Sequence, residues 1–258
     1  MPRLITLTTD FGVRDCYAAA MKGVIATLAP SATILDLTHE IAAHDVFEAA
    51  VFLAGATPYF PPETIHVVVV DPGVGTARRP VAVRAGGATY VCPDNGVLTL
   101  ALRRMPLEEA REIRSAAFRR ECVSATFHGR DVFAPAAAAL AAGASFSAIG
   151  PRMAALTELD APRVTRDVER IAGAVVHVDR FGNGITNVHR EDVGAAAVRE
   201  VVIGGRTLPM ERTYGDVAPG GALALWGSSD LLEVAVHRGR ADVALGATRG
   251  APVEVWIG

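Results

Sequence analysis

The sequence is poor in lysine and cysteine, and each shortage excludes a class of protein. Lys22 is the only lysine, and arginine supplies the rest of the 25 basic residues in a chain whose net charge is −3. These cations form no stripe that could follow a phosphate backbone, so we expect no nucleic-acid partner. Cys16, Cys92 and Cys122 are odd in number and widely spaced. That spacing favours reduced thiols over a disulfide framework or a zinc-ligand pair.

Long hydrophobic runs are missing as well. The apolar stretch 134–142 contains a proline and falls well short of the about 20 residues that a membrane span requires. The N-terminus reaches a Thr-Thr-Asp sequence too soon for the hydrophobic region of a secretory signal. We therefore expect a cytoplasmic protein with no membrane partner. His39 and His44 match no common metal-ligand spacing, and we expect no metal.

What the chain does contain is the pattern of a globular α/β protein. Half of its 258 residues are hydrophobic and 21% are charged, which suits one large or two modest domains. The run 65–70 is apolar enough to be a strand buried on both faces. Strands are expected at 4–9, 32–37 and 65–70, helices at 15–28, 44–53 and 132–142, and a hairpin at 81–92 that turns at Gly86-Gly87.

The pattern of predicted secondary structure changes after about residue 155. Short β-rich runs such as 174–178 and 222–226 are separated there by glycine turns. The fold class predicted is α/β: a Rossmann-like α/β domain at 1–156, a linker at 157–167, and an all-β, barrel-like domain at 168–258.

Two acidic loops should lie beyond the carboxyl ends of the first-domain strands, where α/β sheets usually bind ligands. One carries Asp10, and the other begins at Asp71 in VVVVDPGVGTARRP, 67–80. That stretch lacks the Gly-Lys-Ser/Thr ending of a phosphate-binding loop. It offers an acid, glycines that allow close approach of the backbone, and Arg78 within reach of the acid. A salt bridge is the simpler explanation of the pair taken alone.

The stretch STFHGRDVFAP, 124–135, places His128, Arg130 and Asp131 in a turn before a predicted helix. Helix starts favour anions and disfavour charged histidine. Asp131 by itself is best explained as the cap of that helix. His128 is harder to explain as a structural residue.

Two polar stretches stand out in the second domain. DRFGNGITN, 179–187, suits recognition of a flat, hydrogen-bonding ligand, although an ordinary Asn-Gly turn also explains it. WGSSDLLEVAV, 226–236, puts Ser228 and Ser229 before a strand that carries Glu233. A solvated acid on an edge strand would explain that pattern equally well.

Seven stretches form an ordered set over nearly the whole chain: TLTTDFG (6–12), YAAAMKGVI (17–25), DLTHEI (36–41), VVDPGVGTARRP (69–80), PDNG (93–96), STFHGRD (124–130) and DRFGNGITN (179–187). Together they resemble the S-adenosylmethionine hydroxide adenosyltransferases, also called S-adenosylmethionine hydrolases. These enzymes are relatives of the fluorinases and chlorinases. The ordered set is far more specific than any of its motifs.

The resemblance implies hydrolysis of S-adenosylmethionine to adenosine and methionine, with water or hydroxide attacking the ribose 5′ carbon. Because the sulfonium is an excellent leaving group, the reaction needs no metal, no cofactor and no acid, only a positioned water. Asp71, Arg78 and His128 match the catalytic triad of the family. In that triad Arg78 would steady the hydroxide, while Asp71 and His128 would orient the water and accept its proton.

The resemblance also implies the substrate contacts. Asp10 would bind the ribose hydroxyls, since a carboxylate can accept two hydrogen bonds. Phe181 and Asn183 would lie in the substrate pocket, and Asp179 would lie near the methionine amine.

Three further contacts rest on looser matches. Ser228 would meet the methionine carboxylate, Glu233 would help hold the ammonium, and Tyr214 would stack on adenine. Gly227 stands where relatives often have an asparagine, which leaves the methionine-end contacts open. The family also implies a homotrimer, with each site formed between the first domain of one subunit and the second domain of its neighbour.

Two alternatives differ in chemistry. A halide-dependent halogenase would share the fold and substrate, but the carboxylate of Asp71 at the position of the nucleophile would repel a bare halide. The resemblance implies that fluorinases carry a tyrosine at the position of Asp71 and lack the histidine of HGRD. A sensor that binds adenosine or S-adenosylmethionine without turnover is the other alternative, which the triad disfavours.

Overall fold

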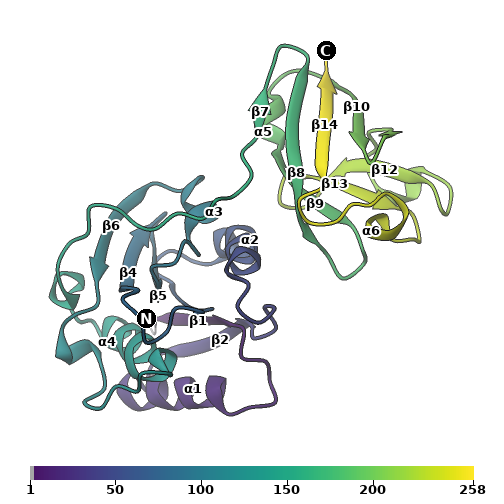
Figure 1. Ribbon diagram of the computed structural model, residues 1–258. Coiled ribbons are helices and arrows are strands. Elements are labelled where there is room, and N and C mark those ends of the chain that lie inside the picture. The colour runs from purple at the N-terminus through teal and green to yellow at the C-terminus, as the bar shows by residue number, and fades with distance from the viewer. Residues whose placement is uncertain (1–2) are drawn as a thin grey trace. The chain divides into compact units, whose positions relative to one another are not determined.

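The computed structural model describes residues 3–258. The chain divides into two compact units, of which the first ends at Leu159 and the second is Asp160–Gly258. The first unit contains the purple, blue and teal elements of Figure 1, and the second contains the green and yellow ones. The hydrophobic cores of the two units are separate.

The first unit is built on a mixed sheet whose strand order is β2-β1-β3-β5-β4-β6. The strands β2, β1, β3 and β5 run parallel, and β4 and β6 are antiparallel to their neighbours. Residue Thr6 of β1 lies opposite His66 of β3. The strands are β1 (Leu4–Thr9), β2 (Thr33–Thr38), β3 (Ile65–Val69), β4 (Pro80–Ala85), β5 (Ala88–Pro93) and β6 (Leu107–Glu112).

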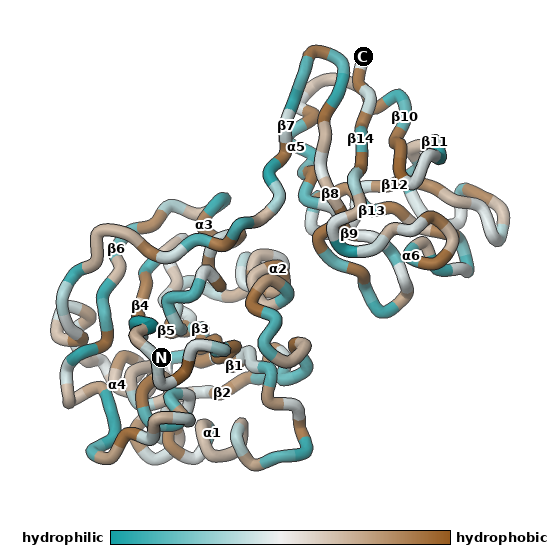
Figure 2. The backbone as a smooth tube through the Cα atoms, in the orientation of Figure 1, coloured by the Kyte–Doolittle hydropathy of each residue, from teal (hydrophilic) through white to brown (hydrophobic). Residues whose placement is uncertain are grey.

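Helices cover both faces of this sheet (Figure 1). The side chains of Ile65 and Val67 join one core with α1 and α4, whereas Val68 joins the other core with α2. Figure 2 shows the hydrophobic colour along β3, which is buried on both faces of the sheet, and along much of α2. The helices are α1 (Tyr17–Leu28), α2 (Val46–Ala56), α3 (Thr99–Leu102) and α4 (Ala134–Ala141), with a π-helical segment at Gly129–Phe133 and 3₁₀ turns at Thr57–Tyr59, Ala116–Phe118 and Phe146–Ile149.

The second unit is an antiparallel, nearly closed barrel-like sheet of order β11-β10-β14-β8-β9-β13-β12, with β7 beside β8. Met210, just after β11, bridges to Ala224 of β12 and brings the two ends of the sheet together. Its elements are β7 (Thr165–Arg166), β8 (Arg170–Val178), β9 (Gly184–His189), β10 (Val198–Ile203), β11 (Arg206–Leu208), β12 (Ala222–Trp226), β13 (Leu231–Val236), β14 (Pro252–Ile257), α5 (Arg190–Val193), α6 (Ala241–Ala244) and a 3₁₀ turn at Tyr214–Asp216.

The predicted fold class is confirmed, and so is the hairpin that turns at Gly86-Gly87, both of which have positive φ. The predicted helix 132–142 is confirmed as α4 over 134–141, but its first two residues belong to the π-helical segment. The strongly charged β6 was not predicted as a strand, and the short helix α3 was not predicted either. Among residues 3–258 there is no helix long and apolar enough to span a membrane.

Candidate functional site

Two acidic residues follow neighbouring parallel strands and meet at one edge of the first sheet. Thr9, the last residue of β1, is paired with Val69, the last residue of β3. Asp10 and Asp71 therefore leave the sheet side by side, at its carboxyl edge. Both line a cavity of about 270 Å³ that lies within the first unit, and His128 lines the same cavity.

Arg78 joins Asp71 to His128. Its Nε donates to Asp71 Oδ1 at 3.0 Å, and its Nη2 donates to Asp71 Oδ2. The same Nη2 lies 3.1 Å from Nδ1 of His128. The Asp71 and Arg78 side chains are only 5% and 7% exposed. The salt bridge expected for this pair is thus present, but it is buried beside a cavity and extends to a histidine 50 residues further along the chain.

The contact between Arg78 and His128 defines the state of the imidazole. A guanidinium can only donate hydrogen bonds, so Nδ1 of His128 has to accept and carries no proton. The neutral ring then bears its proton on Nε2, the nitrogen that remains for the cavity. Burial lowers the pKa of His128, and the charge of Arg78 lowers it further, which keeps this ring neutral.

The carboxyl group of Asp71 is shifted in the opposite direction. Burial raises its pKa above the ordinary value, although the charge and hydrogen bonds of Arg78 oppose that rise. An acid of this kind is a stronger base than a solvated aspartate when it is ionised. The site therefore pairs a basic carboxylate with a neutral imidazole.

The two loops that carry these residues touch at a glycine. Gly75 has φ +78°, and a Cβ at this position would lie 2.6 Å from the carbonyl oxygen of Ala125. Only glycine allows so close an approach in this conformation. Arg78 also lies over the ring of Phe133, 5.4 Å from its centroid. The triad is thus held together by contacts between loops as well as by its own hydrogen bonds.

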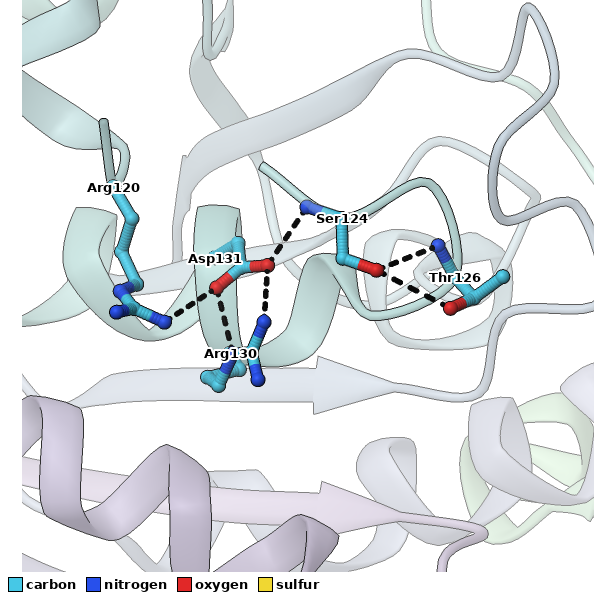
Figure 3. A network of polar contacts seen from close by, with 5 residues as sticks. All are labelled: Arg120, Ser124, Thr126, Arg130 and Asp131. Carbon is cyan, nitrogen blue, oxygen red and sulfur yellow. Dashed lines mark hydrogen bonds and ion pairs between the residues drawn. The ribbon is translucent and has the colours of Figure 1, made fainter. Parts of the chain in front are cut away.

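Asp131 does not cap the helix that follows it, so that prediction was wrong. It lies inside the π-helical segment and is fully buried. Its carboxylate accepts from the side chains of Arg130 and Arg120 and from the backbone N–H of Ser124 (Figure 3). Burial raises the pKa of this carboxyl group, but these hydrogen bonds outweigh burial and hold the pKa at about 2.

A second chain of polar contacts supports the loop of Asp10. Nδ1 of His39 lies 2.8 Å from the hydroxyl of Thr9, and its Nε2 lies 3.1 Å from Asp36. Lys22, the only lysine, contacts the other oxygen of Asp36 at 2.5 Å. Asp10 itself accepts from the backbone N–H of His44 at 2.9 Å. Within residues 3–258 no group of three or more His, Cys, Asp or Glu is placed to hold a metal ion.

Sequence reasoning missed the aromatic wall of this cavity. Phe11, Tyr17 and Phe127 pack edge to face or tilted, with ring centroids 5.2 to 5.9 Å apart. All three line the cavity. Each lies within or next to a polar motif, and that position was the available signal. Such a wall suits the apolar and π-bonded parts of a ligand.

The second unit has a cavity of its own, of about 670 Å³. The structure brings together here all the residues that the sequence had proposed for this unit. They are Asp179, Phe181, Asn183, Tyr214, Ser228 and Glu233.

Asp179 holds the loop that forms one wall of this second cavity. Its Oδ1 accepts from the backbone N–H groups of Phe181 and Asn183, at 2.9 and 2.8 Å, and its Oδ2 accepts from Asn183 Nδ2 at 3.0 Å. A carboxylate cannot donate, so it turns the amide nitrogen of Asn183 toward itself. Phe181, in this loop, is 73% exposed.

Glu233 is a buried acid and not a solvated one, which removes the edge-strand explanation. Its strand β13 lies between β9 and β12, and the residue is 6% exposed. Tyr214 donates its hydroxyl to Oε1. Burial raises the pKa of Glu233, the Tyr214 bond lowers it, and Asp179 raises it again. A Cβ at Gly227 would lie 2.9 Å from Oε2, so the absence of a side chain there leaves room for this carboxylate.

Comparison with known proteins gives, for both units, the family that the sequence motifs resemble. Residues 5–150 match the model of the SAM hydroxide adenosyltransferase N-terminal domain, and residues 173–254 match that of the C-terminal domain. SAM is S-adenosylmethionine.

Individual relatives agree with these models. An (R)-S-adenosyl-L-methionine hydrolase of Thermus thermophilus is 44% identical over 98% of this chain and 99% of its own. A fluorinase of Nocardia brasiliensis is 28% identical over 99% and 97%. The crystal structure of an uncharacterized conserved protein from Thermotoga maritima superposes with a TM-score of 0.89, at 35% identity, over 98% and 99%. Since the family models match both units and the hydrolase matches nearly end to end, the chain belongs to the S-adenosylmethionine hydroxide adenosyltransferase family.

Proposed function

We propose that this chain hydrolyses S-adenosyl-L-methionine to adenosine and L-methionine. The observation that carries the proposal is that Asp71 and His128 line one cavity together with Asp10, while Arg78 joins the first two side chains by hydrogen bonds. The curated relative of 44% identity bears the name of this hydrolase.

The reaction is a displacement at carbon. The bond between C5′ and the sulfonium sulfur breaks, a bond from water oxygen to C5′ forms, and one proton is released. The sulfur leaves as a neutral thioether, so no acid, metal or cofactor is required for the leaving group. The enzyme has to place a water in line with the breaking bond and withdraw its proton.

We assign these tasks within the triad from its contacts. Asp71 is the proton acceptor, because its carboxylate lines the cavity and keeps further acceptor capacity beyond the two bonds from Arg78. His128 donates its Nε2–H to the water oxygen and stabilises the hydroxide as charge develops. Arg78 orients both residues and fixes the tautomer of the imidazole. The family resemblance implied that Asp71 and His128 together accept the proton, and the contact of His128 with Arg78 favours Asp71 as the acceptor.

Substrate binding is shared between the cavities of the two units. Asp10 accepts hydrogen bonds from the ribose hydroxyls. Asn183, Phe181 and Tyr214 contact the adenine, and Asp179 holds the loop that positions the first two.

The methionine end is assigned to the same second-unit cavity. Ser228 meets the carboxylate of methionine, and Glu233 and Asp179 hold its ammonium. The negative charge of Asp179 raises the pKa of Glu233, and a cation bound between the two acids would relieve this repulsion.

We further infer a homotrimer whose sites lie at subunit interfaces, with domain boundaries at 1–156, 157–167 and 168–258. The division into two units near residue 159 supports these boundaries. Light scattering coupled to gel filtration tests the trimer. Co-expression of Asp71→Asn with Glu233→Gln tests the interface, because shared sites would restore about a quarter of the activity, whereas sites within one chain would restore none.

Product analysis tests the reaction. Purified protein is incubated with S-adenosylmethionine in H₂¹⁸O, and adenosine carrying ¹⁸O at the 5′ position is expected together with methionine. Chloride or fluoride should give no 5′-halogenated nucleoside. If the ligand were bound but returned unchanged after long incubation, the protein would be a sensor and the proposal would be wrong.

Variants test the division of roles. Asp71→Ala and His128→Ala should lose turnover with modest loss of affinity, whereas Asp10→Ala should mainly weaken binding. Equal losses of rate and affinity in all three variants would contradict these assignments.

A further inference from the structure

Asp131 is a buried acid that the proposed reaction does not use. It is 0% exposed, and its carboxylate makes more bonds than a helix cap needs. Arg130 donates to both oxygens, at 2.7 and 2.8 Å, and Arg120 donates to Oδ1 at 3.1 Å. The backbone N–H of Ser124 donates to Oδ2 at 2.9 Å. Charge-assisted hydrogen bonds are stronger than those between neutral groups, so Asp131 holds firmly the segments that donate to it.

What it anchors is the loop that leads to His128. Asp131 fixes the loop at Ser124 through its carboxylate and at Arg120 through its backbone carbonyl, which accepts at 2.9 Å. The hydroxyl of Ser124 continues the network to the hydroxyl of Thr126 at 3.2 Å, and Figure 3 shows the chain of contacts from Arg120 to Thr126. Thr126 lines the cavity two residues before His128.

The π-helical segment around Asp131 contacts the triad at both of its ends. His128 precedes the segment and lies against Nη2 of Arg78, and Phe133 ends it beneath the same guanidinium. Such segments are rare and occur mostly at functional sites. Asp131 lies in the middle of this one, so it ties the segment to the loop on its other side.

We propose that Asp131 is a positioning residue for the hydrolysis, holding the loop 119–128 against the π-helical segment and so keeping His128 in contact with Arg78. This inference rests on the proposed function for its effect on rate. Its structural part stands on the contacts alone. A displacement of about 1 Å at a reacting group can lower a rate about 100-fold, so a remote anchor can control turnover.

A graded set of variants tests the proposal. Arg120→Met removes one bond to the carboxylate, Arg130→Met removes two, and Asp131→Asn disturbs all four. The kcat should fall in that order, by about 10- to 100-fold for Asp131→Asn, while KM changes less than about threefold. Adenosine affinity should stay unchanged, because Asp10 is held separately by His44. The two arginine heads are partly exposed, so these variants should fold even if Asp131→Asn does not.

Glu109→Gln is the matched control. It removes the charge of another acid in the same unit, which pairs with Arg111 on β6 at 2.7 Å. This variant should leave kcat unchanged.

Two measurements do not depend on activity. Hydrogen exchange of a peptide covering 119–128 should speed up in Asp131→Asn, while β1 and β3 keep their protection. The ring nitrogens of His128, identified by comparison with His128→Gln, should show the Nε2–H tautomer in the parent protein and a mixture of tautomers in Asp131→Asn.

The outcomes separate the two proposals. If the parent protein made no adenosine, the proposed function would be wrong, and exchange and ring signals would still decide the anchoring. Unchanged exchange and unchanged ring signals in Asp131→Asn would overturn the anchoring. A kcat within twofold of the parent, or parallel losses in kcat, KM and adenosine affinity, would overturn the positioning role.

Discussion

Acid should destabilise the first unit through His66, a buried histidine on the strand that leads to the site. His66 of β3 is 1% exposed, and its Nδ1 lies 2.8 Å from the hydroxyl of Thr6 on β1. The ring stacks on Tyr90 at 5.1 Å, and among the described residues its Nε2 has no hydrogen-bond partner. Burial lowers the pKa of His66 from 6.5 to about 4.

The sign and size of the effect follow from these two values. Between about 4 and 6.5 the unfolded chain takes up a proton at His66 and the folded chain does not, so falling pH favours unfolding. The contribution is complete above pH 6.5 and is lost as pH falls toward 4. At about 1.36 kcal/mol for each pH unit, the free energy of unfolding drops by about 3.4 kcal/mol in total, and by about 2 kcal/mol at pH 5.

His66→Asn separates this term from other titrations, because asparagine can still accept from Thr6 and does not titrate. The variant loses stability at every pH, but between pH 7 and pH 5 it should lose about 2 kcal/mol less than the parent. Hydrogen exchange of peptides from β1 and β3 gives the free energy of unfolding of the first unit. Both tryptophans, Trp226 and Trp256, lie in the second unit, so their fluorescence during urea denaturation is an internal control. An equal loss in parent and variant between the two pH values would refute the reasoning.

Three further predictions concern the site. Gly75→Ala should lower kcat at least about tenfold, because its Cβ would lie 2.6 Å from the Ala125 carbonyl oxygen and push the two triad loops apart. Gly87→Ala is the control, since it has a similar positive φ but its Cβ would have no atom closer than 3.9 Å. Equal kcat in these two glycine variants would contradict that prediction. His39→Ala should weaken adenosine binding about three- to tenfold, measured by calorimetry, because it removes the hydrogen bond that supports Thr9 beside Asp10. The second-unit variant His189→Ala is the control, and an unchanged affinity in His39→Ala would reject the role of His39. Because burial raises the pKa of Asp71 and its ionised form is the base, kcat/KM should fall on the acid side with a midpoint above the ordinary aspartate value. That midpoint should persist in His128→Gln and vanish from the residual activity of Asp71→Asn, and the reverse pattern would make His128 the base.

The sequence by itself determined the architecture of both units and the placement of the acidic loops. Period-two and helical patterns located β1, α1, β2, α2 and β3 to within a few residues, because each pattern reflects a face that has to be buried. The sequence also placed Asp10 and Asp71 in loops beyond the carboxyl ends of their strands, whereas the pairing of β1 with β3 that makes the two loops neighbours is seen only in the folded sheet. Strand β6 escaped this reasoning. Its sequence LEEARE is charged, and pairing with β4 at the sheet edge decides its conformation.

Only the tertiary structure decided how the polar groups pair. Arg78 and His128 are 50 residues apart, and no local pattern could state that one donates to Nδ1 of the other and fixes its tautomer. Asp131 has the residue type and position of a cap, yet its partners include Arg120 and Ser124, which the fold delivers from the preceding loop. The bond between Tyr214 and Glu233 likewise joins a turn to an interior strand. Hydrophobic periodicity is a property of each segment, whereas the partners of a buried polar group are set by whichever segments pack beside it, so only the folded chain specifies them.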